Sequence, residues 1–455
     1  MPGRMQFNLD LGRAAGARPT AAGGKAPMRL LVLGDFSARP AAERPPLAER
    51  RTHRVDLDSV DAVLQRLAPR LQLAAGEIDF EQLDDFHPDA IYRRLPLFDA
   101  LREAWARPPQ AGGDLLGSLL GKPAAAPTTP AAPAKAAPGL DAFIRGIVAP
   151  HIVQDNSAQN RSYVSAVDAA TTEQMRKLLH DPAFQALESA WRGVQWLIQS
   201  LELDETLELH LFDVSRDELL ADVVAAQGKL AQTGLHRALA DRWRNAPGGQ
   251  GWSLLTGLYR FGPGDTDIGL LAALGLLASQ AGGPFVAGGD PALASSDVAA
   301  LAGWQALRHS EAAPWIGLAA PRVLLRLPYG KATDKVESFA FEEFDATPVH
   351  EEFLWGPGSL AVALLIGRAF TARGWEFEPG DEREIGDLPA YTYLHDGERE
   401  LQACAEQYLG EQGGNALLAA GLMPVLSHRH ANAVTVMRFQ SVAEPAQALA
   451  GLAMP

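Results

Sequence analysis

The sequence predicts a mixed α/β protein in which a small N-terminal α/β unit is tethered to a larger α/β domain. Three observations predict this. Short apolar segments with strand character alternate with segments of helical periodicity, and they do so in two separate parts of the chain. A Pro- and Ala-rich segment lies between the parts, and its residues 122–139 have no aromatic residue and no periodic apolar face. We therefore divide the chain into residues 1–106, a linker of residues 107–139, and residues 140–455.

Composition sets the broad class of the protein. A chain of 455 residues with 47% hydrophobic residues can bury a large core. Its formal charge of −15 disfavours nucleic acid and anionic membranes as partners. The single cysteine, Cys404, excludes an intrachain disulfide and a cysteine-based zinc site. No signal-peptide pattern is present, and the longest apolar run, residues 268–278, is too short to span a bilayer, so we expect a cytoplasmic protein.

The N-terminal segment MQFNLDLG has the alternation of a half-buried strand. Its apolar residues occupy every second position: Met5, Phe7, Leu9 and Leu11. A Gly-, Ala- and Pro-rich spacer separates this segment from the next strand, MRLLVLGDF, residues 28–36. The partner of the isolated strand can therefore be a sheet edge elsewhere, including one in another molecule. The alternative is a first strand that folds onto its own domain.

The rest of the N-terminal part has the pattern of a helix followed by a strand and a turn. Apolar residues at positions 60, 63, 64 and 67 have helical spacing after Asp58, a candidate N-cap, and Pro69 closes the helix. The strand EIDFEQL and the turn DDFHPD follow. Together with MRLLVLGDF, these elements predict a small α/β unit.

Two helices open the second part of the chain. Thr171 and Gln174 stand in capping-box register, which predicts a helix start, and Asp181 before Pro182 predicts another. One apolar stripe of the second helix steps by three and four residues, and we expect it to be buried core: Phe184, Leu187, Trp191, Val194, Ile198 and Leu201.

Strands then alternate with helical stretches. The strands are predicted at LELHLFDVS, GWSLLTGLYRF and RVLLRLPYG, and the helical stretches include residues 297–308. The segment GPGSLAVALLIGRAF is helical in pattern and apolar on nearly every face over residues 360–366. Such a helix must lie deep in the fold or between subunits.

The short motifs do not predict an active site. YGKAT has one glycine before Lys331, and GSLLGKP has the wrong spacing, so neither forms a phosphate-binding loop. HEEF lacks the spacing of a zinc protease, and no G-x-S-x-G elbow occurs. His428 and His430 can share one side of a strand, but no third metal ligand is evident.

The adjacent glutamates of FAFEEF, residues 339–344, are the remaining candidates for chemistry. A strand here would place Glu342 and Glu343 on opposite faces. Diverging carboxylates cannot act as a close acid–base pair on one substrate. We therefore expect no enzyme activity and no cofactor. An enzyme on this scaffold would need convergent polar groups in a pocket, which the sequence does not show.

Longer segments resemble the contractile-sheath proteins of type VI secretion systems. Two segments resemble the large subunit, TssC or VipB: LPYGKATDKVESFAFEEF and HEEFLWGPGSLAVALLIGRAFTARGW. Further segments stand in the order of that family: MRKLLHDPAFQALESAWRGVQWLI, WSLLTGLYRFGPGDTDIGLL, GGPFVAGGDP and WQALRHSEAAPWIGLAAPRVLLRLPYG. The small subunit, TssB or VipA, is similar to MRLLVLGDFS, HRVDLDSVDAVLQRLAPRLQL and DDFHPDAIYRRLPLFDALREAW. The chain thus resembles both subunits fused in one polypeptide, without the usual C-terminal region of the large one.

The resemblance implies a contractile tail-sheath-like protomer. Such a protomer polymerises around, or docks on, an inner tube and stores conformational energy for contraction. The implied partners are other sheath subunits, inner tube and baseplate proteins, and a separate disassembly ATPase. The missing C-terminal region leaves open a sheath-like accessory, such as a cap, baseplate adaptor or assembly factor, that does not polymerise alone.

The resemblance also implies roles for two short segments. Residues 5–11 correspond to a strand that links neighbouring protomers. The segment DLLGSLLG in the linker is our candidate for the part that the ATPase grips, through Leu115, Leu116, Leu119 and Leu120. The alternative is an apolar patch that packs on its own domain.

Overall fold

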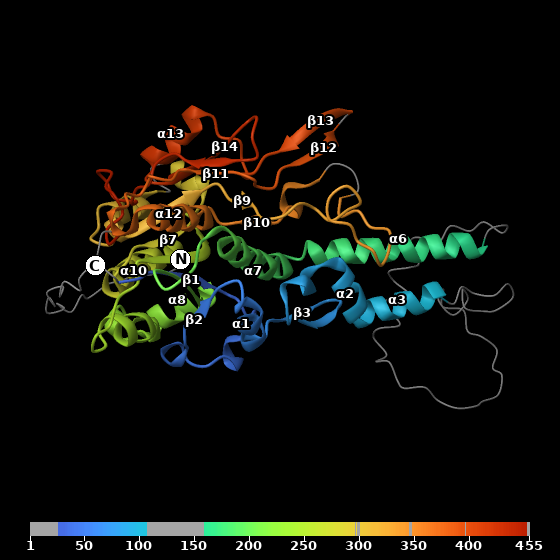
Figure 1. Cartoon of the computed structure of the whole chain (residues 1–455), viewed down its shortest axis with the longest axis horizontal. Helices are drawn as coiled ribbons and strands as arrows, with labels where there is room; N and C mark the ends of the chain where they lie inside the picture. The colour runs from blue at the N-terminus through green and yellow to red at the C-terminus, as the bar shows by residue number, and fades with distance from the viewer. Residues whose placement is uncertain are drawn as a thin grey trace, which may run out of the picture. The chain divides into compact units, whose positions relative to one another are not determined.

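The computed structural model describes residues 26–106, 159–295, 297, 301–344, 348–395 and 397–452 (Figure 1). These residues belong to two compact units. Unit 1 comprises Met1–Pro69, Ala186–Leu327 and Phe353–Pro455, and unit 2 comprises Arg70–Gln185 and Pro328–Glu352. Each unit therefore takes segments from both sides of the linker. The division of the sequence at residues 106 and 139 stays a prediction.

Unit 1 is built on a nine-stranded sheet with the order β11-β15-β14-β8-β7-β6-β1-β5-β2. The strands are β1 (Met28–Gly34), β2 (His53–Val55), β5 (Leu207–Asp213), β6 (Leu254–Phe261), β7 (Phe285–Gly289), β8 (Ile316–Ala320), β11 (Glu384–Ile385), β14 (Met423–Ser427) and β15 (Val434–Val436). The central pairings are parallel, and those of β2, β11 and β15 at the edges are antiparallel. Strand β1, from before the linker, is thus an interior strand among strands from after it.

Two helices cover opposite faces of the central strands. Leu31 and Leu33 of β1 belong to the core cluster that contains the apolar residues of α10 (Asp265–Ala281). Leu30 instead approaches Gly367 of α12 (Ser359–Arg373). Because alternate side chains of a strand point to opposite faces, α10 and α12 lie on opposite sides of β1, as Figure 1 shows. Helix α12 is buried along most of its length, which confirms the deep burial predicted for it.

Helix α7 (Pro182–Ser200) forms as its sequence predicts. The Asp181 carboxylate accepts a hydrogen bond from the N–H of Ala183 at 2.9 Å, so Asp181 caps the helix that Pro182 opens. The predicted apolar stripe is buried at every position: Phe184, Leu187, Trp191, Val194, Ile198 and Leu201.

Unit 2 combines a two-stranded sheet with helices from both sides of the linker. Its elements are β3 (Arg70–Leu73), β4 (Gly76–Asp79), η3 (Leu83–Phe86), α2 (Pro88–Arg94), α3 (Pro96–Ala106), α6 (Gln159–Leu179) and η9 (His350–Glu352). The rings of Phe80 and Phe86 stack with centroids 4.2 Å apart, and both lie within about 6 Å of the Phe184 ring. The core of unit 2 therefore also joins the two parts of the sequence.

The remaining elements of unit 1 are mostly short. They are η1 (Ala41–Glu43), η2 (Leu47–Glu49), α1 (Val60–Leu67), α8 (Arg216–Ala225), η5 (Leu230–Gln232), α9 (Gly234–His236), the π-helix η6 (Arg237–Arg244), η7 (Pro291–Ala294), α11 (Ala302–Arg308), η8 (Ala313–Trp315), β9 (Val323–Leu324), β10 (Trp355–Gly356), η10 (Gly374–Glu376), β12 (Tyr391–His395), β13 (Glu398–Gln402) and α13 (Glu411–Ala419). Strands β9 and β10 pair with each other, and β12 and β13 form a hairpin.

Several local predictions are wrong. Thr171 does not begin a helix: it lies inside α6, where its hydroxyl donates to the carbonyl of Val167 at 2.8 Å. The N-cap of α1 is Ser59 rather than Asp58. The strand predicted at RVLLRLPYG shrinks to the two residues of β9, and Tyr329 forms only an isolated bridge with Asp334.

Candidate functional site: contacts between the segments before and after the linker

The site residues predicted from the sequence lie outside the described residues. They are Met5, Phe7, Leu9 and Leu11, and Leu115, Leu116, Leu119 and Leu120. The structure describes another feature, the contacts that join the segment before the linker to the segment after it. We call these contacts the unit 1 junction and the unit 2 junction.

Strand β1 forms the backbone of the unit 1 junction. It pairs with β5 over its full length, from Met28 opposite Leu207 to Gly34 opposite Asp213. Its other edge pairs with β6, beginning with Leu30 opposite Leu254. Because both edges are hydrogen-bonded, removal of β1 would leave two interior strands without their partners.

A buried ion cluster closes the junction at the carboxyl ends of β1 and β5. Arg50 donates to both carboxylate oxygens of Glu218, and one of these bonds is 3.1 Å long. Arg44 donates to Glu218 at 2.9 Å and to Asp35 at 2.6 Å. The side chains of Arg44, Arg50 and Glu218 are each no more than 10% exposed. Burial makes such pairs sensitive to the loss of either partner.

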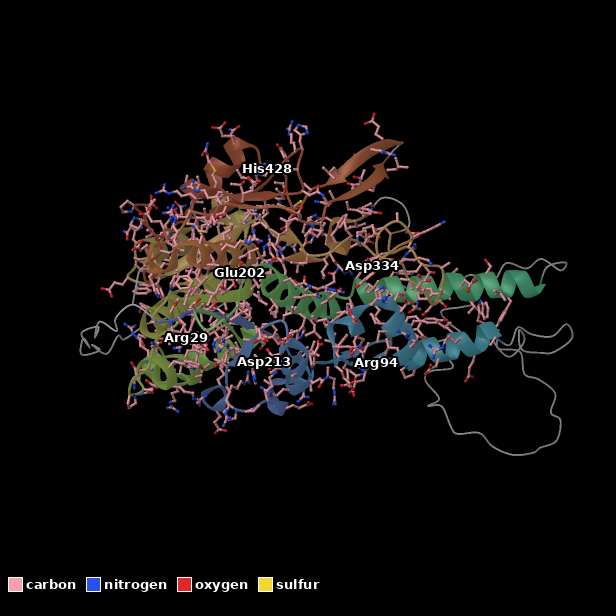
Figure 2. All side chains as sticks on the ribbon, viewed as in Figure 1. Arg29, Arg94, Glu202, Asp213, Asp334 and His428 are labelled. Atoms are coloured by element: carbon pink, nitrogen blue, oxygen red, sulfur yellow. The ribbon has the colours of Figure 1, made fainter. Side chains whose placement is uncertain are left out.

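Asp213 ties the turn after β1 to the end of β5. Its carboxylate accepts from the N–H of Phe36 at 2.8 Å, and from the N–H and hydroxyl of Ser37 at 3.0 and 2.7 Å. Arg44 lies 3.8 Å away. Figure 2 labels Asp213, at the carboxyl end of β5, and Arg29, near the amino end of the neighbouring parallel strand β1. The two residues mark the two ends of the unit 1 junction.

The pKa values of two carboxylates in the cluster are shifted in opposite directions. Burial opposes ionisation of Glu218, but the hydrogen bond from Arg50, the N–H of Ser215 and the charges of Arg44 and Arg50 outweigh it and lower its pKa. Burial raises the pKa of Asp35, against the influence of Arg44. Each of these acids already has an arginine partner, so the arrangement suits a structural contact rather than proton transfer.

A second polar group lies near the start of β1. Arg29 pairs with Glu208 of β5 at 3.0 Å, and its guanidinium lies 5.3 Å from the ring centre of Trp243. Glu208 also lies 3.1 Å from the ring of His210. Burial is the largest influence on His210 and lowers its pKa, although Glu208 acts in the opposite direction. Arg29 thus links β1 to two elements that follow the linker.

The loop that carries η2 packs on α9 and η6. Arg242 donates to the carbonyls of Arg50 and Ala48 at 2.6 and 2.8 Å. A Cβ atom at Gly234 would lie 2.8 Å from the Cβ of Leu47 and 3.0 Å from the backbone nitrogen of Ala48. Only glycine allows this close approach of the two backbones.

Aromatic contact completes the unit 1 junction. The indole N–H of Trp191 donates to the carbonyl of Phe36 at 2.9 Å, and the two rings meet edge to face at 5.4 Å. Both side chains are fully buried. The apolar stripe of α7 therefore contacts the segment before the linker directly.

The unit 2 junction depends on Asp89 of α2. Its carboxylate accepts from the N–H groups of Glu337 and Ser338 at 3.0 and 2.7 Å. Burial raises the pKa of Asp89, but these hydrogen bonds outweigh burial, and the net shift is downward. Nearby, the rings of Tyr92 and Phe339 lie 4.7 Å apart. Helix α2, which precedes the linker, thus holds the loop that contains residues 337–339.

The Tyr329-Gly330-Lys331 turn is held by the two glutamates of FAFEEF. Glu343 accepts from the N–H of Tyr329 at 2.7 Å, and Glu342 accepts from the N–H of Lys331 at 3.1 Å. The strand predicted for these glutamates is wrong: the segment is irregular, and both carboxylates meet the same turn. Because these N–H groups donate within the protein, the turn is scaffold rather than a phosphate loop.

The other polar candidates occupy ordinary positions. His428 lies 2.7 Å from the hydroxyl of Thr435, and His430 is exposed. Burial raises the pKa of the Cys404 thiol to about 11, which keeps it protonated. In the part of the chain that the structure describes, His, Cys, Asp and Glu side chains form no group of three suited to a metal ion. Among the described helices, none combines the length and apolarity needed to cross a bilayer.

Sequence reasoning missed most of the junction residues because no local spacing marks them. Arg50 and Glu218 are 168 positions apart, and Asp89 and Ser338 are 249 positions apart. One local signal was present: Ser215 and Glu218 stand in capping-box register and form that box at the start of α8. It identifies Glu218 as a helix-capping residue but not as the partner of Arg50.

Two family models match the chain. Residues 161–443 match VipB, described as the EvpB/VC_A0108 tail sheath N-terminal domain. Residues 21–110 match T6SS_VipA, described as type VI secretion system, VipA, VC_A0107 or Hcp2. The matches do not overlap, and most of the linker lies between them.

Two curated proteins of Pseudomonas aeruginosa are similar to the chain. The type VI secretion system sheath protein TssC1 is 30% identical over 309 residues, covering 63% of this chain and 62% of the relative. The sheath protein TssB1 is 32% identical over 89 residues, covering 17% of this chain and 52% of the relative. The chain thus spans less than two thirds of each of these relatives.

Proposed function

The chain belongs to the tail sheath family of type VI secretion systems, with a VipA-like segment before the linker and a VipB-like segment after it, and we propose that it is a structural component of a contractile sheath. One observation carries the proposal. Strand β1 of the VipA-like segment lies between β5 and β6 of the VipB-like segment. A single chain therefore contains both kinds of sheath segment in fixed one-to-one stoichiometry.

The fusion has a physical advantage for such a component. A covalent tether gives the two segments an effective concentration of the order of millimolar, so pairing does not depend on the supply of a separate small subunit. The buried cluster of Arg44, Arg50 and Glu218 then holds the paired state. The protomer polymerises around, or docks on, an inner tube, and contraction draws on the difference between two packings of protomers.

The proposal assigns roles to the segments predicted from the sequence. Residues 5–11 link neighbouring protomers as an added strand. Leu115, Leu116, Leu119 and Leu120 serve as the grip for a disassembly ATPase. Inner tube and baseplate proteins are the further partners. The proposed work of the chain is mechanical, in line with the names of TssC1 and TssB1 as sheath proteins.

A second candidate function is a sheath-like accessory that caps or templates a sheath and does not polymerise alone. The edges of the nine-stranded sheet favour it. Strand β2 has three residues and includes the exposed Arg54, and β11 has two residues and includes the exposed Glu384. Short, charged edge strands discourage the addition of further strands.

Negative-stain electron microscopy of the purified chain, alone and with sheath subunits of the same cell, tests both candidates. Tubes that contain the chain along their length indicate a main sheath component. Tubes of other subunits that carry the chain only at their ends indicate an accessory. Sheath subunits without the chain serve as the control. Single particles that bind neither sheath nor baseplate components would contradict both.

A further inference from the structure

Residues 328–344, which we call the strap, are the longest described segment of unit 2 without a helix or a strand. Loops longer than about 12–15 residues without secondary structure are uncommon in compact domains and are often functional. Side chains elsewhere in unit 2 hold the backbone of the strap. Asp89 of α2 accepts from two of its N–H groups, and Arg176 of α6 donates to the carbonyl of Glu342 at 3.0 Å.

His180, which directly follows α6, lies between two carboxylates. Its Nε2 is 3.5 Å from Oε1 of Glu343 in the strap, and its Nδ1 is 3.7 Å from Oε1 of Glu352 in η9. The side chain of Glu343 is fully buried, and that of His180 is 16% exposed. Within the described residues, Nε2 of His180 is buried without a hydrogen-bond partner. Each ring nitrogen therefore faces one carboxylate at ion-pair distance.

This geometry suits one charge state of the ring. A neutral imidazole has a single N–H, so its other nitrogen presents a lone pair to a carboxylate. The imidazolium has an N–H on each nitrogen and can donate to Glu343 and Glu352 at the same time. Its positive charge also compensates the buried negative charge of Glu343. Protonated His180 therefore joins the strap to η9, whereas neutral His180 satisfies only one of the two carboxylates.

Other groups near His180 do not compete for its proton in the same way. The ring of Phe344 packs against the imidazole with centroids 6.1 Å apart and carries no charge. On η9, His350 and Glu351 are the other titratable residues. The remaining charged residues around His180 have partners of their own: Arg176 with the carbonyl of Glu342, Lys177 with Glu173, Asp181 with the N–H of Ala183, and Glu342 with the N–H of Lys331.

We propose that a proton on His180 holds the strap in place, which makes the strap a pH-sensitive element of unit 2. Imidazole is the ordinary side chain whose charge changes between about pH 5 and pH 8. The strap is therefore attached more tightly as pH falls through this range, and it opens locally as His180 becomes neutral. Stronger acid weakens the attachment again by protonating Glu343 and Glu352. Because Asp89 binds N–H groups of the strap, the proton also strengthens the unit 2 junction.

Hydrogen–deuterium exchange of the full chain, followed by mass spectrometry at pH 8 and pH 6, tests the proposal. The rates are corrected for the pH dependence of chemical exchange, and peptides within residues 328–344 report on the strap. Protection of these peptides should be about tenfold higher at pH 6, which is what one hydrogen bond to a charged group contributes. Peptides of β5 are the internal reference and should gain no protection, because protonation of the buried His210 acts against folding.

Three variants assign the response. His180→Gln keeps a polar side chain that cannot be protonated, and it should remove the difference in strap protection between pH 8 and pH 6. Glu352→Gln is the milder variant, because the Glu352 side chain is 32% exposed, and it should reduce the difference by removing one of the two carboxylates. His430→Gln, at an exposed position in unit 1, is the matched control and should keep the whole response. Circular dichroism checks that each variant is folded.

A second histidine near the strap makes a further pair of variants necessary. Nε2 of His87 lies 3.6 Å from Asp334 of the strap, which Figure 2 labels. His87→Asn removes this charge and can still cap α2, and His350→Gln removes the histidine of η9. Both should keep most of the response. Equal strap protection at the two pH values in the parent overturns the proposal, as does a response that persists in His180→Gln or disappears in His87→Asn or His350→Gln instead. If His180→Gln does not fold, an unchanged response in Glu352→Gln overturns it.

Discussion

Arg50 donates to both carboxylate oxygens of Glu218, although 168 positions of sequence and the linker separate them. Both side chains are buried to within 10% exposure. The first turn of α8, which follows β5, is therefore fastened to the loop that follows β1. A buried pair of this kind adds little stability over an apolar replacement, but loss of one partner leaves an uncompensated charge.

We predict that Glu218→Gln destabilises the protein by about 3–5 kcal/mol, because Arg44 and Arg50 then remain buried with their main partner neutral. Urea unfolding followed by circular dichroism measures the change. Glu77→Gln is the control, because Glu77 pairs with Arg70 at the surface, where both side chains are nearly half exposed, and should cost less than about 1 kcal/mol. Equal effects of the two variants would show that the cluster contributes no more than a surface pair.

Acid should destabilise the protein in two steps. His210 has a pKa below its ordinary value of 6.5, so the unfolded chain binds its proton first, and stability should begin to fall below pH 6.5. Glu208, Glu218 and Asp89 have pKa values below their ordinary 4.5 and 3.8. Their contribution is complete above those values and is lost as pH falls through the lower values of the folded state.

Unfolding free energies between pH 7 and pH 3 test this pH dependence. Glu218→Gln should remove part of the decline below pH 4.5 and leave the shallower decline below pH 6.5 unchanged. The assignment fails if the variant and the parent lose stability along parallel curves below pH 4.5.

Cutting the linker should leave the two segments associated. Cleavage at a protease site introduced within residues 122–139 breaks the covalent link between the VipA-like and VipB-like segments. Strand β1 should keep its pairing with β5 and β6. The cut protein should elute as one species in size-exclusion chromatography and separate only in denaturant. Separation of the segments under native conditions would mean that the covalent tether, rather than the two junctions, maintains the pairing.

The elements predicted correctly are those whose signal is local. The stripe of α7 and the apolar run of α12 both follow from periodicity within one segment, and both are buried as expected. The capping of α7 by Asp181 also follows from a local pair of residues. Thr171 shows the limit of such signals, because a capping-box spacing also occurs by chance within a longer helix.

The placement of β1 could not follow from local signals. Its apolar run predicts a buried strand, but nothing in it identifies β5 and β6 as partners rather than strands nearer in sequence. The strand predicted for Glu342 and Glu343 is wrong for a related reason. An isolated segment predicts a strand, whereas the N–H groups of the turn at Tyr329 and Lys331 determine where the carboxylates lie.

Deletion of residues 5–11 should weaken self-association and leave the fold unchanged. If the segment links neighbouring protomers, the protein without it should keep its circular dichroism spectrum and its melting temperature within about 2 °C, while sedimentation shows fewer assemblies. Replacing the segment with a Gly- and Ser-rich sequence of equal length is the matched control for chain length. A large drop in melting temperature would instead place the strand in its own domain, the alternative that the sequence leaves open.

Trp191 should be required for pairing of the two segments once the linker is cut. Its indole contacts Phe36 through both a hydrogen bond and an edge-to-face ring contact. Trp191→Ala removes both and should cost about 3–5 kcal/mol. In the intact chain the tether compensates for part of this loss, so the fold persists with a lower melting temperature. In the cut protein the same loss weakens the affinity between segments by two to three powers of ten or more, at about 1.4 kcal/mol per factor of ten.

Trp304→Ala separates this role from packing in general. Trp304 is also fully buried, but its indole donates to the carbonyl of Ala420, which follows the linker as Trp304 does. Trp304→Ala should lower the melting temperature of the intact chain about as much as Trp191→Ala does. It should change the affinity between the cut segments much less than Trp191→Ala. Titration of one segment against the other, followed by the fluorescence of a dye on the VipA-like segment, measures that affinity. If Trp191→Ala and Trp304→Ala weaken it equally, the contact with Phe36 is not what holds the VipA-like segment, and the pairing depends on the sheet and the ion cluster alone.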